Sequence, residues 1–135
     1  MMKRRKTREV KIGDLIVGGE HSISVQSMTT TKTHDITATL KEVERLEEAG
    51  CQIIRITVPD QPAADALYEI KKRMNVPLVA DIHFNYRMAL EAVDAGADKI
   101  RINPGNIGGK KRVKKVLEKV SKQVLKKVSK KWSNK

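Results

Sequence analysis

Polar side chains that could bind or transform a charged ligand occur at the ends of several short apolar runs. The set holds two arginines, a carboxylate, an imidazole and an amide: Arg55, Arg101, Asp81, His83 and Asn103. The two arginines hold equivalent places in an internal repeat, each five residues after a glycine and between two isoleucines. Guanidinium groups form bidentate hydrogen bonds with phosphate oxygens. Two that converge therefore predict a site for a phosphate or diphosphate.

The remaining polar groups extend this prediction. Asp81 and His83 are two residues apart, so they share one face of a strand and could hydrogen-bond or transfer protons. Three further polar residues follow the first apolar run: Gln26, Ser27 and Thr29. The glycine-rich segment Asn103–Gly109 would present backbone N–H groups to a phosphate, although it matches neither the Walker A nor the GxGxxG pattern.

Structural roles compete with each of these functional interpretations. Either arginine could be an ion-pair partner inside the fold, and Asp81 or His83 could cap a loop. The glycines at 105, 108 and 109 could serve only a tight turn. Cys51 precedes an apolar strand and is expected to be an inert thiol of the core.

Alternating strands and helices must position these residues. Strands are predicted over 24–28, 53–58, 77–83 and 100–103, and helices over 36–49, 63–74 and 86–95, the first with Asp35 as N-cap and Gly50 as C-cap. This order predicts βαβ units in a parallel sheet, with the polar residues at one rim. The fold class is therefore α/β: the first half of a (β/α)8 TIM barrel, about four βα units, with a basic C-terminal helix.

Charge divides the 135 residues into three parts. The net charge is +12, of which residues 1–11 carry +5 and residues 110–135 carry +11. We expect a basic N-terminal arm at 1–11, a partial TIM-barrel domain at 12–112 and a Lys-rich helical tail at 113–135. The only cysteine excludes a disulfide scaffold and a Cys-based metal site, so no metal ligands are predicted. Without a secretory signal or a membrane-spanning run, a cytoplasmic protein is expected.

The basic tail supports an alternative function. Its valines and leucines hold helical spacing opposite a lysine-covered face, a pattern typical of helices that bind nucleic acid or anionic membrane surfaces. Aromatic residues make up only 3% of the chain, which disfavours base stacking. A solvated lysine face without a partner explains the same pattern.

Four segments resemble the N-terminal part of 4-hydroxy-3-methylbut-2-enyl diphosphate synthase, an enzyme family of the non-mevalonate (methylerythritol phosphate) route to isoprenoids. They are VQSMTTTKTHDITAT, IIRITVP, VPLVADIHFNYRMAL and KIRINPGNIGG, and the resemblance covers about residues 4–112. It implies a TIM-barrel oxidoreductase that reductively opens and dehydrates 2-C-methyl-D-erythritol 2,4-cyclodiphosphate. A pterin-synthase type of phosphate-binding barrel would share the fold but not these strings.

The resemblance also implies roles and partners. Arg55 and Arg101 match diphosphate-binding arginines, and Asp81, His83 and Asn103 match polar residues of the same mouth, here assigned as catalytic. A [4Fe-4S] cluster in a C-terminal domain, a flavodoxin or ferredoxin electron donor and a homodimer are implied for the family.

This chain departs from the family after its fourth helix. It has no match to the later strands or to the cluster cysteines, and Cys51 does not match a cluster ligand. We therefore expect a truncated or frame-shifted product that is inactive alone and prone to self-association. A separately encoded C-terminal half would be the partner that restores activity.

Overall fold

A four-stranded parallel sheet forms the centre of the structure, a computed structural model that describes residues 7–20, 24–103 and 107–133, with side chains as far as residue 123. Its strands, in spatial order, are β3 (Gln26–Met28), β4 (Ile53–Thr57), β5 (Leu78–Ile82) and β6 (Lys99–Ile102). Neighbours in the sequence are neighbours in the sheet, and all pairs are parallel. The predicted α/β architecture with about four βα units is confirmed.

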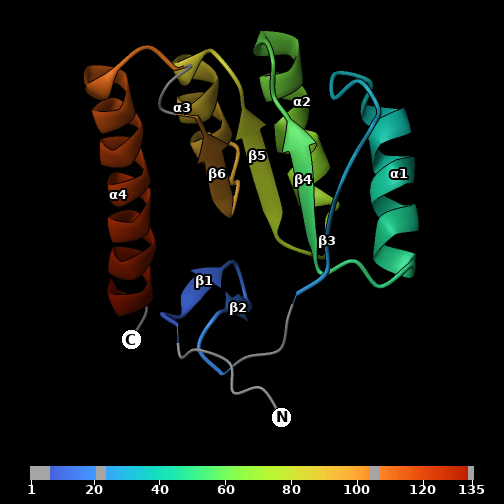
Figure 1. The fold of residues 1–135 in the computed structure, drawn as a ribbon, viewed down its shortest axis with the longest axis horizontal. Helices are drawn as coiled ribbons and strands as arrows, with labels where there is room; N and C mark the ends of the chain where they lie inside the picture. Colours follow the sequence, from blue (N-terminus) through green and yellow to red (C-terminus); the bar gives the residue numbers. More distant parts are fainter. Residues whose placement is uncertain (1–6, 21–23, 104–106, 134–135) are drawn as a thin grey trace.

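Four helices connect and flank the strands: α1 (Ile36–Glu48), α2 (Gln61–Lys72), α3 (Tyr86–Asp94) and α4 (Lys110–Ser133). The first three cover one face of the sheet, and α4 stands beside α3 (Figure 1). Asp35 caps α1 as predicted, because its carboxylate accepts a hydrogen bond from the backbone N–H of Ala38 at 3.1 Å. The C-cap is Ala49, and Gly50 follows it with φ +94°, so the predicted C-cap lies one residue too late.

Alternating residues of the strands form the main core against these helices. The helix side of β4 and β5 presents Ile54, Ile56, Leu78, Ala80 and Ile82, all of which are buried. They pack with Leu67 and Ile70 of α2 and with Ala89 and Ala92 of α3. Burial of each large aliphatic side chain contributes about 1.5–3 kcal/mol, so this layer supplies most of the hydrophobic stabilisation.

A small hairpin covers part of the opposite face, and sequence analysis did not predict it. Strands β1 (Val10–Ile12) and β2 (Leu15–Val17) pair antiparallel around Gly13, whose φ is +58°. Ile12 packs against Ile53 and Val79. The hairpin lies at the amino ends of the parallel strands (Figure 1). We call the rest of this face, toward the carboxyl ends of the parallel strands, the open face. It lies on the side of the sheet opposite to α1, α2 and α3.

The ends of the chain bear on the predicted division into domains. Val10 and Lys11, in the predicted arm, belong to β1, and α4 begins at Lys110, three residues before the predicted tail. The three-part division stays a prediction. Residues 1–6 of the predicted arm, and the side chains of 124–135, lie outside the described residues. Among the described helices, none is both long and apolar enough to cross a membrane.

Candidate functional site

Strand register brings both arginines and the aspartate to the open face. Asp81 lies opposite Arg101 in the β5–β6 pair, and Arg55 lies opposite Val79 in the β4–β5 pair. Since Val79 and Asp81 are two residues apart, all of these side chains project from the same side of the sheet. The sequence predicted this convergence, and the structure brings the three residues into contact.

The Asp81 carboxylate is the centre of the cluster. It is 1% exposed, and its Oδ1 accepts a hydrogen bond from Nη1 of Arg101 at 2.9 Å. Its Oδ2 lies 3.5 Å from Nε of Arg55 and 3.6 Å from Nε2 of His83. A buried carboxylate needs such partners because desolvation of its charge is expensive. Asp81 therefore fixes the directions of two guanidinium groups.

Arg55 is held on its other side by a sulfur atom. Its Nη2 donates to Sδ of Met28 at 3.4 Å, and the two residues are register partners in β3 and β4. Its Nε is buried and, among the described residues, has no hydrogen-bond partner despite the nearby carboxylate. Sequence analysis assigned Met28 only to a strand. Its place beside Arg55 follows from the parallel register of β3 and β4.

The cluster keeps unused donors. The side chain of Arg55 is 25% exposed and that of Arg101 is 51% exposed. A guanidinium has five N–H donors, and each arginine uses only a minority of them on Asp81 and Met28. The open face therefore offers cationic donors to a ligand while its own carboxylate is buried.

His83 and Asn103 lie at the periphery of this cluster. The imidazole of His83 is about half exposed, and its ring centroid is 6.1 Å from that of Phe84, which is 71% exposed. Asn103 is exposed directly after β6, and its backbone oxygen accepts from the N–H of Ile107 at 3.1 Å. The structure thus places both at the carboxyl ends of their strands.

The threonine-rich loop after β3 is anchored to α1. The N–H and hydroxyl of Thr30 donate to Oε1 of Glu42, at 2.9 Å and 3.0 Å, and Glu42 is only 8% exposed. Three polar residues were predicted near the rim. Thr29 is buried, and its N–H donates to the carbonyl of Arg55. Ser27 is half-buried and Gln26 is exposed. Sequence analysis missed Glu42, whose helical position alone carries no sign of this role.

The glycine-rich segment is described only in part. Pro104, Gly105 and Asn106 lie outside the described residues. Gly108 and Gly109 both have positive φ, +103° and +94°, and lead into α4. A Cβ at Gly108 would stand 2.5 Å from Nη1 of Arg112, so glycine leaves room for that side chain.

Cys51 and the acidic residues give no candidate metal site. The thiol of Cys51 is buried and donates to the carbonyl of Ile53 at 2.9 Å, as a core thiol would. Within the part of the chain that the structure describes, no group of three or more His, Cys, Asp or Glu side chains could hold a metal ion.

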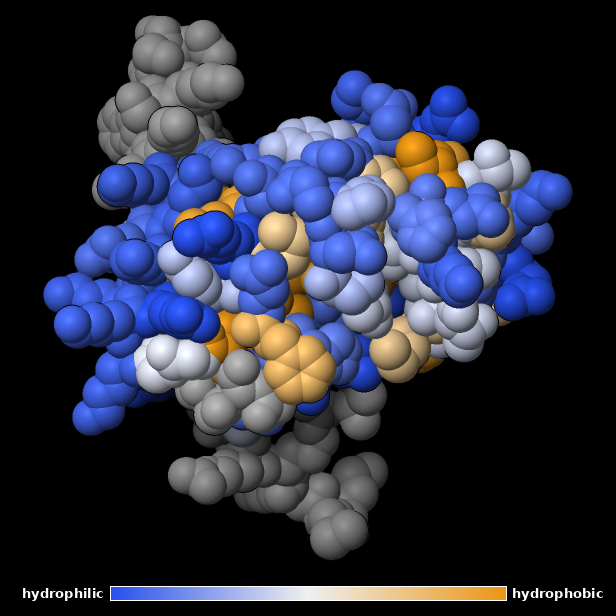
Figure 2. Space-filling view, turned by 90° about the horizontal axis from the view of Figure 1, so that it is seen from above, coloured by the Kyte–Doolittle hydropathy of each residue, from blue (hydrophilic) through white to orange (hydrophobic). Residues whose placement is uncertain are grey.

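Seen from the carboxyl ends of the strands, the surface is mostly hydrophilic, with small hydrophobic patches (Figure 2). The predicted site lies at this end. Its arrangement of one half-buried and one exposed guanidinium around one buried carboxylate is suited to binding an anion rather than an apolar ligand.

Several known proteins are similar to this chain. The chain is 60% identical over 117 residues to 4-hydroxy-3-methylbut-2-en-1-yl diphosphate synthase (flavodoxin) of Bacillus cereus (strain B4264). The aligned region covers 87% of this chain and 32% of that protein. It is 58% identical over 118 residues to the protein of the same name from Anoxybacillus flavithermus, again with 87% and 32% covered. A thiamine phosphate pyrophosphorylase from Pyrococcus furiosus superposes with a TM-score of 0.48 at 21% identity, covering 76% of this chain and 59% of that one.

The chain spans about a third of the length of these synthases. The family model of the GcpE TIM-barrel domain matches residues 7–126, which include the hairpin, the whole parallel sheet and the first part of α4. Arg55, Asp81 and Arg101, which we call the Asp81 cluster, all lie within that match. The chain belongs to the GcpE TIM-barrel domain family.

Proposed function

We propose that this chain supplies part of the diphosphate-binding barrel of a 4-hydroxy-3-methylbut-2-enyl diphosphate synthase. The proposed substrate is 2-C-methyl-D-erythritol 2,4-cyclodiphosphate, which that reaction opens reductively with loss of water. One observation carries the proposal: Arg55 and Arg101 converge on the buried carboxylate of Asp81 and keep exposed donors. The relatives that are 58–60% identical bear the name of this enzyme.

The charge of these side chains favours an anion at this site. Two guanidinium groups share one carboxylate, so the three side chains together carry a net positive charge. An anionic diphosphate would offset it and accept the donors that Asp81 leaves free. Asp81 itself would touch the arginines rather than the phosphates, since like charges repel.

The other polar residues have proposed roles around the reacting carbons. His83 is half exposed and 3.6 Å from Asp81, so it can exchange a proton with a substrate hydroxyl while the carboxylate orients it. Asn103 can donate or accept a hydrogen bond at the end of β6. Asp81, His83 and Asn103 are the residues we assign to catalysis in the complete site.

The reducing chemistry requires groups that this chain does not supply. A [4Fe-4S] cluster is ligated by several cysteine thiolates, and the single cysteine, Cys51, is buried against backbone carbonyls. The residues of this chain therefore do not fit the cluster. We propose that turnover needs the cluster-bearing part on another polypeptide segment, in a cytoplasmic assembly of two subunits, with flavodoxin or ferredoxin as electron donor. By itself the chain is expected to bind the cyclodiphosphate without converting it.

Calorimetric titration with the cyclodiphosphate tests the proposal. The wild-type chain, Arg55→Ala, Arg101→Ala and a matched control, Arg73→Ala, would be compared at one ionic strength. Arg73 is an exposed arginine at the carboxyl end of α2, and among the described residues it has no ion-pair partner. Saturable binding that is lost in both site variants and kept in the control is the expected result.

Loss of a charged hydrogen-bonding group from such a site typically costs about 1.5–3 kcal/mol, or about ten- to a hundredfold in affinity. Circular dichroism would show that each variant is folded. Equal weakening in Arg73→Ala would mean that general positive charge, rather than the Asp81 cluster, attracts the ligand, and would contradict the proposal.

A further inference from the structure

The contact between α3 and α4 differs in charge balance along its length. Toward the carboxyl end of α3, Nζ of Lys119 lies 2.8 Å from Oδ1 of Asp94, and Gln123 donates to the same oxygen at 3.3 Å. Toward the amino end of both helices the cations Arg112 and Lys115 lie over the ring of Tyr86 and, among the described residues, form no ion pair. Cζ of Arg112 is 5.2 Å and Nζ of Lys115 is 5.5 Å from the ring centroid. An aromatic face is a much weaker counter-charge than a carboxylate.

The side chain of Arg112 is held in place by the backbone. Its Nη1 donates to the carbonyl of Ile107 at 3.5 Å and passes over Gly108, where any Cβ would come within 2.5 Å. Arg112 lies over Tyr86 and has several further donors for another partner. Its planar guanidinium fork is pre-organised, so it loses less entropy per hydrogen bond than a lysine ammonium does.

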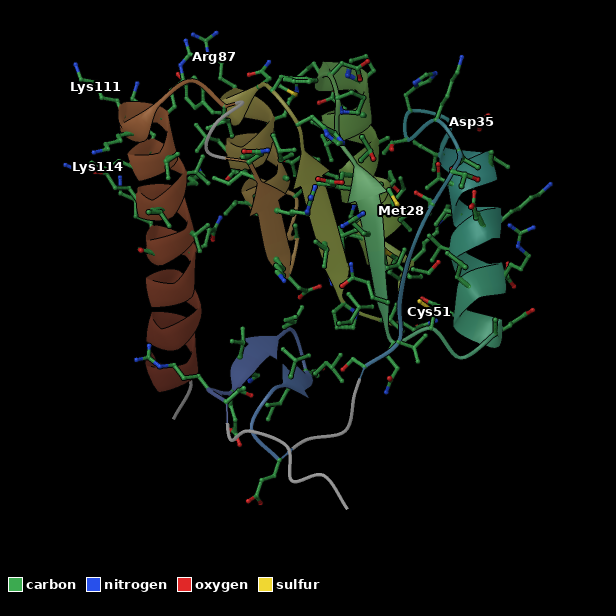
Figure 3. The ribbon with its side chains drawn as sticks, viewed as in Figure 1. Met28, Asp35, Cys51, Arg87, Lys111 and Lys114 are labelled. Carbon is green, nitrogen blue, oxygen red and sulfur yellow. The ribbon has the colours of Figure 1, made fainter. Side chains whose placement is uncertain are left out.

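A third cation completes the group. Arg87 follows Tyr86 in the first turn of α3, and its hydrogen bond to the phenol, with the charge of Lys115, lowers the pKa of Tyr86. We call Tyr86, Arg87, Arg112 and Lys115 the rim cluster. Figure 3 shows Arg87 and Lys111 at the same end of α3 and α4, away from Met28, which contacts Arg55.

The rim cluster contains no carboxylate. Among the described residues, none of Arg87, Arg112 and Lys115 has an acidic group within 4.0 Å, and neither do the neighbouring Lys111 and Lys114. Such a concentration of like charge opposes folding unless an anion offsets it. Arg87 and Arg112 also lie in the first turns of α3 and α4, the end where the helix dipole disfavours positive charge. Natural sequences place residues against such local electrostatic preferences mainly at functional sites.

We propose that the rim cluster binds a phosphate group, separately from the Asp81 cluster. Two guanidiniums and an ammonium provide charged donors for a tetrahedral dianion, and the phenol of Tyr86 provides a neutral one. The ligand class is a phosphate monoester or inorganic phosphate, either free in solution or as the headgroup of a lipid. This inference does not depend on the identity of the substrate at the open face.

Tyr86 is a spectroscopic probe for this site. The chain has two tyrosines, so Tyr68→Phe leaves Tyr86 as the only phenol that titrates in the near-ultraviolet. Bound phosphate would offset the neighbouring cations that favour the phenolate, so phosphate should raise the pKa of Tyr86 relative to chloride at equal ionic strength. The Asp81 cluster contains no tyrosine, so Arg101→Gln should leave the phosphate-induced shift in the pKa of Tyr86 unchanged. The shift therefore tests the rim cluster independently of whether the open face binds the cyclodiphosphate.

Calorimetric titration with inorganic phosphate measures the affinity. Arg112→Gln is expected to weaken binding about tenfold or more, as expected for one charged hydrogen-bonding group. Lys122→Gln removes the same charge from an exposed position of α4 and should have no such effect. If Arg112→Gln does not fold, Arg87→Gln takes its place, with circular dichroism as the check.

Vesicles of phosphatidylcholine with phosphatidic acid separate the two sources of phosphate. Co-sedimentation that free phosphate competes away, and that Arg112→Gln abolishes, would identify a lipid headgroup; binding of free phosphate without co-sedimentation would identify a soluble ligand. The proposal is overturned if phosphate shifts Tyr86 no more than chloride does, or if Lys122→Gln weakens binding as much as Arg112→Gln.

Discussion

The two faces of the parallel sheet use the same four strands for different purposes. On the helix side, every inward residue of β4 and β5 is apolar and buried, from Ile54 to Ile82. On the opposite face, the hairpin covers Ile53 and Val79 near the amino ends of the strands. The open face beyond the hairpin carries Arg55, Asp81 and Arg101. Because successive side chains alternate, one strand contributes to stability on one side and to the proposed binding site on the other.

The largest expected effect concerns the helix side. Ile56 is fully buried, so Ile56→Ala should lower the free energy of unfolding by about 2–5 kcal/mol, through lost transfer energy and the cavity left behind. Val10→Ala, at a residue that is 52% exposed, is the control and should change it by less than about 0.5 kcal/mol. Urea unfolding followed by circular dichroism measures both. Equal effects would mean that the two faces do not divide stability and binding as described.

Asp81→Asn tests the open face, with a smaller effect on stability and a large one on binding. The amide keeps the shape but loses the charge that orients two guanidiniums, so unfolding should become easier by about 1–3 kcal/mol. Affinity for the cyclodiphosphate should fall although the site becomes more positive. A rise in affinity, measured by titration calorimetry, would show that net charge matters and orientation does not.

Helix capping should affect stability alone. Asp35→Ala removes the acceptor for the N–H of Ala38 and should cost about 1 kcal/mol in urea unfolding. Asp35→Asn keeps an acceptor and should restore most of that loss. Because the cap lies outside both clusters, anion affinity should stay as in the wild type; a parallel loss of affinity would show that the start of α1 belongs to the site.

The smallest effect separates the two tyrosines. Burial raises the pKa of Tyr68, with Glu91 and Asp94 adding to it, whereas the hydrogen bond from Arg87 and the charge of Lys115 lower the pKa of Tyr86. Ultraviolet titration should therefore show two steps, and Tyr86→Phe should remove the first. Because the pKa of Tyr86 is lowered in the folded state, its phenolate stabilises the fold at high pH, and this contribution is lost as the pH falls through the folded-state pKa. The pKa of Tyr68 is raised, so its contribution is present at lower pH and is lost as the pH rises through the folded-state pKa. Loss of the later step in Tyr86→Phe would contradict the account of the rim cluster.

Patterns that repeat within a single element were predictable from the sequence. Short strand-like runs, one of them β-branched, indicated the four parallel strands, and Asp35 before an apolar helical stripe indicated the start of α1. The hairpin was missed because its two strands are three residues long, too short to show alternation, and part of the first lies in a basic segment.

Contacts between distant segments were predictable only in outline. Equivalent places in a repeat indicated that Arg55 and Arg101 would meet, but not that Asp81 would lie between them, since that depends on strand register. Each arginine forms an ion pair with Asp81, as the structural interpretation predicted. The ligand interpretation stays a prediction. The rim cluster depends on how α4 packs on α3, which no local pattern specifies.

Phosphorus NMR of the cyclodiphosphate is the most direct test of the central claim that the Asp81-held arginines bind a diphosphate. The ligand has two phosphorus atoms in one ring, and both resonances should shift in a saturable way when the wild-type chain is added. The shifts should be absent with the folded double variant Arg55→Ala/Arg101→Ala and should persist with Arg112→Gln, whose change is at the rim cluster. Undiminished shifts with the double variant would contradict the account.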